Sequence, residues 1–202
     1  YKRQYMQTAC LPVRLEIENT GTTASSSTYK QICTSVISEG GYELAGKSRT
    51  YGQDPVPGIR LETVGTYYPV ISIRVNPNRL DAIVVPNAMG LMPVNAANYR
   101  WKIISGATIT GATWANAESS STVQYQSNTT AVLVANTGTV LDSGYITSTV
   151  QGGGQINLAD GAFRYQLERN SFTSTPIVLT LAVTASAATS NVAGSITWQE
   201  IT

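Results

Sequence analysis

The chain has 202 residues, 42% of them hydrophobic, which is enough to build a buried core and argues against wholesale disorder. Only 12% of the residues are charged, so the polarity of the chain comes mainly from 26 Thr and 19 Ser. The net charge is +1, and because nucleic-acid binding draws on clustered Lys and Arg, no nucleic-acid partner is expected. With no histidine and two cysteines, the sequence excludes histidine-dependent catalytic triads, imidazole metal sites and four-cysteine metal sites. No apolar run approaches the roughly 20 residues that span a bilayer, and no signal-peptide pattern opens the chain, so no membrane partner is expected.

Hydrophobic and polar residues alternate with a period of two in four segments, which predicts strands with one face in a core and the other in water. In chain order these segments are 11–18, 99–103, 162–169 and 196–199. Tyr99, Trp101, Tyr165 and Trp198 fall on their apolar sides and are predicted core residues. Other segments are rich in β-branched and aromatic residues without clean alternation, which suits strands covered on both faces: 30–37, 59–64, 66–75, 80–85, 107–114, 130–134 and 177–184.

Turn signals separate these segments at intervals of about ten residues, as in antiparallel sandwiches and barrels. They are Asn19-Thr20-Gly21, Gly40-Gly41, Gly52-Gln53-Asp54-Pro55, Asn76-Pro77-Asn78, Asp142-Ser143-Gly144 and Asp160-Gly161. We therefore predict an all-β fold, an antiparallel β-sandwich of jelly-roll type, with one domain over residues 1–202. The stretch 86–97 is predicted to be a loop because it carries Pro86, Gly90 and Pro93. It is either a domain seam or, as we favour, a long crossover within one sandwich.

The two cysteines, Cys10 and Cys33, form either one disulfide or two small buried apolar residues. If 11–19 and 28–38 pair as a hairpin, Arg14 lies opposite Cys33, and Cys10 is about 13 Å further along the strand. A disulfide needs Cα atoms within about 7 Å. This register favours free thiols, and the redox compartment stays open.

Two pairs of glutamates are the nearest approach to catalytic carboxylates. Glu16 and Glu18 would share one strand face about 7 Å apart, near the separation in inverting glycosidases. Their alternation with Arg14 is more typical of a solvated charge ladder. Glu39 and Glu43 flank a glycine turn, where a structural or contact role is more typical. We predict no catalytic residue.

The remaining polar motifs also favour structural roles. Asp54, Asp142 and Asp160 lie in turn sequences, where Asp binds nearby backbone amides, and none has the spacing of a calcium loop. The glycine run at 151–155 lacks the Lys-Ser/Thr and the helix start of a phosphate loop, so a hairpin tip or subunit contact is favoured. Asn128 begins a glycosylation sequon that this composition produces by chance. We predict no cofactor-binding and no metal-binding residue.

Two further features concern the surface. Residues 119–130 are almost all Ser, Thr, Gln and Asn, which predicts an exposed strand edge or loop. The eleven Tyr and three Trp could line a sugar-binding platform or serve as core and interface anchors. Both alternatives stay open at this point, although the strand alternation favours the core for Tyr99, Trp101, Tyr165 and Trp198.

Three stretches go beyond generic β composition. Residues 11–20 read LPVRLEIENT, residues 30–43 read KQICTSVISEGGYE, and residues 194–201 read GSITWQEI. They resemble the recurrent LPVRYEIENT…KQICSTVISEGGYE block, and the closing a-S-I-x-W-x-E-I pattern, of structural proteins of tailed bacteriophages. Leu15 stands where that family more often has Tyr, a conservative change on a face expected to be buried. The middle of the chain carries no such match.

The resemblance implies a non-enzymatic β-sandwich on the virion, either a capsid-associated or decoration protein or a tail-fibre module. Such a module would act through subunit contacts and strand-edge pairing. Its expected partners are copies of itself, in a homotrimer, and other virion proteins. The alternative is a host-receptor or carbohydrate-binding module of a tail fibre. It predicts exposed Tyr and Trp beside Asn or Asp, and weak host-glycan binding that salt does not affect. A third alternative is a glycan depolymerase with paired carboxyls.

Overall fold

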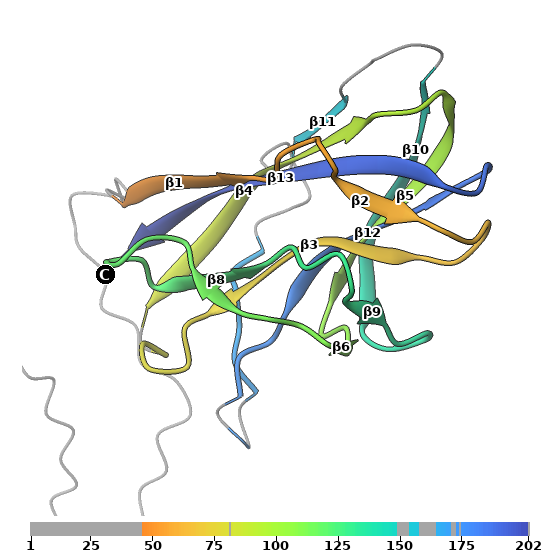
Figure 1. Cartoon of the computed structure of the whole chain (residues 1–202). Helices are drawn as coiled ribbons and strands as arrows, with labels where there is room; N and C mark the ends of the chain where they lie inside the picture. Colours follow the sequence, from red (N-terminus) through yellow and green to blue (C-terminus); the bar gives the residue numbers. More distant parts are fainter. Residues whose placement is uncertain are drawn as a thin grey trace, which may run out of the picture. The chain divides into compact units, whose positions relative to one another are not determined.

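Strands form the regular structure in a computed structural model of the chain, which describes residues 46–80, 82–148, 154–157, 165–170, 173 and 175–201. All of them belong to one compact unit, Leu44–Thr202. The described residues contain no helix and form two main antiparallel sheets and one small sheet (Figure 1). The predicted all-β antiparallel sandwich is confirmed. A single domain over residues 1–202 stays a prediction, since the first 45 residues lie outside the described part.

The first sheet is arranged around β13 (Ser190–Ile201), which runs through its middle (Figure 1). On one side β13 pairs with β4 (Ile83–Pro93). On the other side it pairs with β1 (Lys47–Gly52) and, near its start, with β2 (Ile59–Leu61). The far side of β4 pairs with β11 (Gly154–Asn157), so the order is β1-β13-β4-β11 with every pair antiparallel.

The second sheet has six strands in the order β10-β5-β12-β3-β8-β7. Its strands are β3 (Tyr68–Val75), β5 (Ala97–Ser105), β7 (Ala115–Asn116), β8 (Val123–Gln126), β10 (Thr139–Ser148) and β12 (Leu179–Ala185). The outermost strands are β10, which pairs with β5, and β7, which pairs with β8. Among the described residues, β10 therefore leaves one long side without a strand partner.

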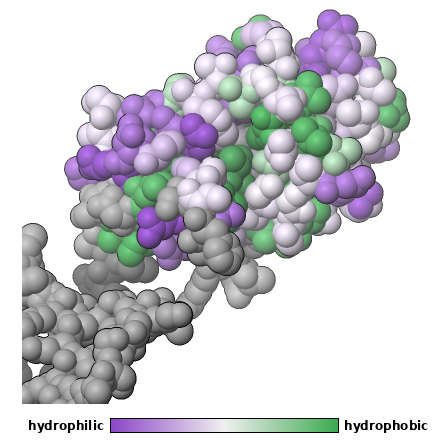
Figure 2. All heavy atoms as spheres, turned by 90° about the horizontal axis from the view of Figure 1, so that it is seen from below, coloured by the Kyte–Doolittle hydropathy of each residue, from purple (hydrophilic) through white to green (hydrophobic). Residues whose placement is uncertain are grey.

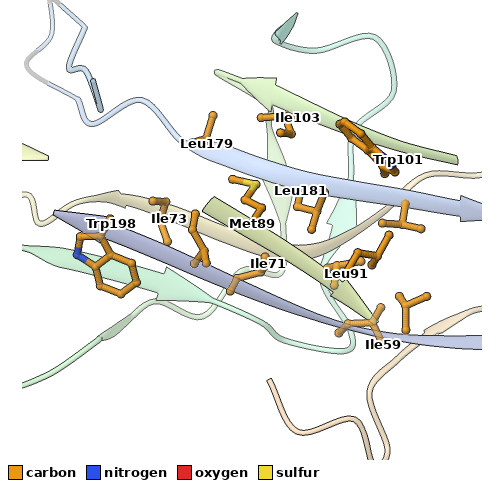
Figure 3. Packing of buried hydrophobic residues seen from close by; sticks show 14 of the residues in the cluster. Ile59, Ile71, Ile73, Met89, Leu91, Trp101, Ile103, Leu179, Leu181 and Trp198 are labelled. Carbon is orange, nitrogen blue, oxygen red and sulfur yellow. The ribbon is translucent and has the colours of Figure 1, made fainter. Parts of the chain in front are cut away.

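The main core lies between these two sheets and is filled by alternate side chains of their strands. Tyr99, Trp101 and Ile103 of β5 are buried there, as is Trp198 of β13, which confirms three of the four predicted aromatic core residues. Figure 3 shows how side chains from both sheets meet in this cluster, with Met89 and Leu91 of the first sheet and Ile71, Ile73, Leu179 and Leu181 of the second. Full burial of each such side chain contributes about 1.5–3 kcal/mol to folding.

A third layer covers part of the outer face of the second sheet. It consists of β6 (Ile109–Thr110) and β9 (Val132–Leu133), which pair with each other. Beneath it lies a second, smaller cluster of buried residues: Ile104, Ala107 and Ala182, with the half-buried Tyr67 and Leu133 packed against them. Ile104 is buried on the outer face because of this layer, although the neighbouring outward residues of β5 are not.

Several predicted boundaries are wrong. The stretch 86–97, predicted to be a loop, is mostly β4 and the start of β5, and only residues 94–96 connect the two sheets. Residues 165–168, predicted to continue a strand from 162, are not in a strand, and 162–164 lie outside the described part. Asp142-Ser143-Gly144, predicted to be a turn, lies inside β10.

The polar segment 119–130 is a further correction. It was predicted to be an exposed edge or loop, yet it contains β8, which pairs with β3 on one side and β7 on the other. Ser121, Thr122 and Gln126 are buried. Strand β1 was not predicted at all, because its sequence KSRTYG is polar and lacks clean alternation.

Candidate functional site

Most of the acidic and cysteine candidates from the sequence lie outside the described residues, so their predicted roles stay predictions. These are Cys10, Cys33, Glu16, Glu18, Glu39, Glu43, Asp160 and the glycines at 152 and 153. Within the described part, no group of three Asp, Glu, Cys or His side chains is placed to hold a metal ion. No helix of that part is long and apolar enough to cross a membrane.

The described candidates among the turn residues bind their own backbone. The Asp54 carboxylate accepts a hydrogen bond from the Val56 N–H at 2.9 Å, which is the predicted turn role. The Asp142 carboxylate accepts one from the Ser143 N–H at 2.7 Å, although in a bulged strand and not in a turn. Asn128 accepts a hydrogen bond from the Thr130 N–H, and its amide donates to the Gly111 carbonyl.

A buried carboxylate that the sequence analysis did not identify joins the first sheet to the segment before β8. Glu200 of β13 is only 3% exposed. Its oxygens accept hydrogen bonds from the Ser121 hydroxyl, the Thr122 N–H at 3.1 Å and the Trp198 Nε1–H at 2.9 Å. The Nε of Arg49 in β1 lies 3.2 Å from Glu200 Oε2 and completes an ion pair.

The environment of Glu200 keeps its side chain charged. Burial by itself raises the pKa of this carboxyl, but hydrogen bonds from Ser121, Trp198 and the Thr122 backbone, together with the charge of Arg49, outweigh it. The net result is a pKa below the ordinary value for glutamate. A carboxylate that is already ionised and surrounded by donors is suited to fixing strands in place and poorly suited to donating a proton.

The surface with the most distinctive chemistry is the outer face of β5 and β10. Because β5 alternates, Arg100 and Lys102 point outward while Tyr99 and Trp101 point into the core. On the neighbouring strand, Tyr145 is the register partner of Arg100 and Ser143 is that of Lys102. We call this surface, defined by Arg100, Lys102, Ser143 and Tyr145, the β5–β10 face.

The first of two hollows on this face surrounds Lys102. It has a volume of about 650 Å³, and the segment between β9 and β10 forms one wall. The Lys102 ammonium lies 4.3 Å from the centre of the Tyr67 ring, a cation–π contact. Tyr67 itself has a raised pKa, mainly because burial disfavours its charged form. Ile104, Leu133 and Val140 supply apolar lining.

A second, smaller hollow of about 230 Å³ adjoins Arg100. The Arg100 guanidinium lies 5.5 Å from the centre of the Tyr145 ring, and that ring is 76% exposed. Thr184 of β12 also lines this hollow. Gly65 lines both hollows, which places them next to each other on the face.

Exposed hydrophobic residues are concentrated around these hollows. The described part has eight large hydrophobic side chains that are exposed, and four of them line one hollow or the other: Val64, Val134, Val140 and Tyr145. On the face seen from below in Figure 2, green hydrophobic areas lie between pale residues of intermediate hydropathy and purple hydrophilic ones. Exposed apolar residues that gather beside fixed polar groups are typical of contact or binding surfaces.

The open side of β10 borders the same face. β10 has ten residues, against six in β1, four in β11 and two in β7, the other outermost strands of the main sheets. Most of its side chains are exposed and only Asp142 carries charge. After a bulge between Val140 and Asp142, its register with β5 is regular to Ser148. A long regular edge with little charge is a template for pairing with another strand.

The sequence analysis found part of this surface. The alternation of Arg100 and Lys102 with core aromatics was visible, and exposed Tyr beside Asn was the expected mark of a glycan site. Tyr145 is exposed as that expectation requires, and Asn98 and Asn136 line the hollows, but no Trp does. The fourth predicted core aromatic, Tyr165, is only half-buried, and its hydroxyl lies 2.6 Å from the Ser105 hydroxyl.

Comparisons with known proteins add no family to this description: no protein-family model, no curated protein and no solved structure matches the chain.

Proposed function

We propose that the chain is a non-enzymatic structural module of a bacteriophage virion, capsid-associated or part of a fibre, that assembles through contacts between its own copies. The observation that carries the assembly part is the open side of β10, the longest outermost strand of the described sheets. The virion part rests on the resemblance of residues 11–20, 30–43 and 194–201 to structural proteins of tailed bacteriophages.

Self-pairing through β10 fits the character of that strand. Natural proteins blunt an exposed edge with lysines, prolines or a very short strand, and the stretch from Ser143 to Ser148 carries none of these. A second copy pairing there would satisfy the backbone N–H and C=O groups on the open side of β10. A homotrimer is the assembly we expect.

The described carboxylates support a non-enzymatic role. Asp54 and Asp142 bind backbone N–H groups, and Glu200 is held by four partners. Glu62 and Glu118 are paired with arginines. A hydrolase with two carboxyls would need a pair facing each other across a cleft with room for substrate. None of these five takes part in such an arrangement, and the sixth described carboxylate, Glu168, is exposed.

The test is the solution mass of the full chain, measured by light scattering over a hundredfold range of concentration. We expect a trimer that survives dilution, and dissociation to monomers in Thr147→Lys, which puts a charge on the exposed edge of β10. Thr113→Lys is the matched control, since Thr113 is exposed but lies outside the strands. A monomeric wild-type chain would refute self-assembly, and an oligomer that Thr147→Lys leaves intact would refute the role of β10.

The second candidate function is the carbohydrate-binding module, and the two hollows on the β5–β10 face favour it. They combine an exposed aromatic ring, apolar lining and polar groups, the composition typical of small-ligand sites. A glycan array probed with the full chain tests this function, which binding to no glycan would refute.

A further inference from the structure

Two cations of the β5–β10 face have no acidic partner among the described residues. Arg49 is paired with Glu118 and Glu200, and Arg60 with Glu62, whereas Arg100 and Lys102 contact only tyrosine rings. A cation that lies over a ring keeps its N–H groups free to donate to another acceptor. Since Arg100 and Lys102 are two residues apart on one strand, their side chains leave the same face of the sheet from Cα atoms about 7 Å apart.

Two buried hydroxyls lie beside these cations and lack a hydrogen-bond partner in the described part of the chain. One is the Thr184 hydroxyl, in a residue only 8% exposed that lines the hollow next to Arg100. The other is the Tyr67 hydroxyl, whose ring lies under Lys102. A buried hydroxyl without a partner costs about 1–3 kcal/mol, so such groups are normally satisfied. Polar groups of a ligand in the two hollows would supply the missing partner of each hydroxyl.

The rest of the lining narrows the class of ligand. Hydrophobic side chains and the exposed Tyr145 ring can cover the apolar face of a sugar ring, while Thr66, Asn98 and Asn136 offer polar groups to its hydroxyls. The larger hollow, at about 650 Å³, lies within the usual size range of small-ligand sites. We propose that the β5–β10 face binds a saccharide that carries a carboxylate, with Arg100 and Lys102 holding the carboxylate and Thr184 a ring hydroxyl.

Other ligand classes fit less well. A nucleic acid requires a broad basic surface, but the chain has 13 basic residues against 12 acidic ones. A metal ion requires carboxylates or other oxygen ligands, and the two hollows have no Asp or Glu among their lining residues. A neutral sugar would leave both cations without an anion. The proposal rests on the glycan-binding function given as the second candidate above, and it is independent of self-assembly through β10.

The test uses the full chain and glycans that contain uronic or sialic acids, each compared with its own methyl ester, in which the same sugar lacks the charge. Binding is measured by titration calorimetry at low and high salt. We expect each acid to bind at least about tenfold more tightly than its ester, because a hydrogen bond to a charged group is lost in the ester. The affinity for the acid should also fall as salt rises, in contrast to the salt-insensitive glycan binding expected from the sequence, because the ligand proposed here is charged.

Variants then separate the proposed roles. Arg100→Gln and Lys102→Gln should each weaken binding of the acid about tenfold or more, whereas Lys47→Gln, which removes an exposed charge from β1, should not. Thr184→Val should weaken binding while leaving the thermal midpoint unchanged or higher, since it removes a hydroxyl that has no hydrogen-bond partner among the described residues.

The outcomes are distinguishable. Equal binding of acids and esters, or full affinity in Arg100→Gln and Lys102→Gln, would overturn the proposed ligand class but leave a glycan-binding function. Binding of no glycan would overturn both. Full affinity in Thr184→Val would overturn the role of that hydroxyl.

Discussion

The network around Glu200 gives the sharpest prediction about stability. In Glu200→Gln, the carboxylate is replaced by an amide of nearly the same shape, so packing is kept and the charge is lost. The amide replaces one carboxylate oxygen with an NH2 group, which then faces either the Thr122 N–H or the Trp198 Nε1–H. Both of these groups are donors, so one hydrogen bond is lost. The substitution also removes one of the two carboxylates that neutralise Arg49.

The magnitude follows from burial. Breaking a buried ion pair by removing one partner costs about 3–5 kcal/mol. Arg49 keeps its contacts with Glu118 and Ser120 after the change, so we expect the lower end of that range, about 3 kcal/mol. The assay is urea unfolding of the full chain followed by Trp fluorescence, with equal slopes required before midpoints are converted into free energies.

Glu118→Gln is the matched control, because it changes the second carboxylate that pairs with Arg49. Glu118 also pairs with Arg49, but its side chain is 63% exposed, so Glu118→Gln should cost no more than about 1 kcal/mol. The reasoning would be refuted if the two variants were destabilised equally, or if Glu200→Gln lost less than 1 kcal/mol.

The same network predicts how stability depends on pH. Since the pKa of Glu200 is lower in the folded protein than in the unfolded chain, its contribution is fully present above the unfolded pKa. The contribution is lost as the pH falls through the folded pKa. The unfolding free energy of Glu200→Gln should therefore fall less steeply on acidification than that of the wild type.

Two glycines in strands give further predictions. A Cβ on Gly194 of β13 would lie 2.8 Å from Val70 Cγ1 of the opposite sheet, so Gly194→Ala should lower the free energy of unfolding in urea by about 1–3 kcal/mol. Gly52→Ala is the control and should not lower it, because the nearest atom to an added Cβ there is 3.7 Å away. A Cβ on Gly144 of β10 would lie 2.5 Å from the Trp101 ring, so Gly144→Ala should displace that indole and shift its fluorescence emission. An unchanged spectrum at unchanged stability would contradict this close approach.

Gly144 also shows why β10 was not predicted. In the sequence, Asp-Ser-Gly is a strong turn signal, because glycine supplies unusual backbone angles and Asp binds nearby amides. Here the glycine provides space for the Trp101 ring across the sheet, and Asp142 caps a bulge inside the strand. A single sequence does not distinguish a glycine needed for space from one needed for a turn.

Most of β4 was missed for a related reason: residues 80–85 were predicted to be a strand, but 86–93 were predicted to belong to a loop. Pro86 lies where the register of β4 with β13 shifts, a place where the lost N–H of a proline is tolerated. Gly90 lies opposite Ser195, whose hydroxyl would clash with an added Cβ. Pro86 and Gly90 both look like strand breakers in the sequence. The structure accommodates Pro86 at a bulge and Gly90 at a close contact between β4 and β13. By contrast, the clean alternation in β5 predicted its buried face, since one side of that strand packs into the core all along its length.

The candidate site was only partly predictable because its members come together through tertiary structure. Arg100 and Lys102 were recognisable as the outward side of a strand, but Tyr67 precedes β3, Tyr145 lies in the unpredicted β10, and Thr184 lies in β12. In a chain with only 12% charged residues, five of the six described acids are already used by backbone amides or arginines, and the sixth, Glu168, is exposed. Arg100 and Lys102 instead contact aromatic rings and have no acidic partner among the described residues. A contact with a ring leaves the positive charge of each side chain unpaired, so a ligand that carries the opposite charge would complete the interactions of both, as proposed above.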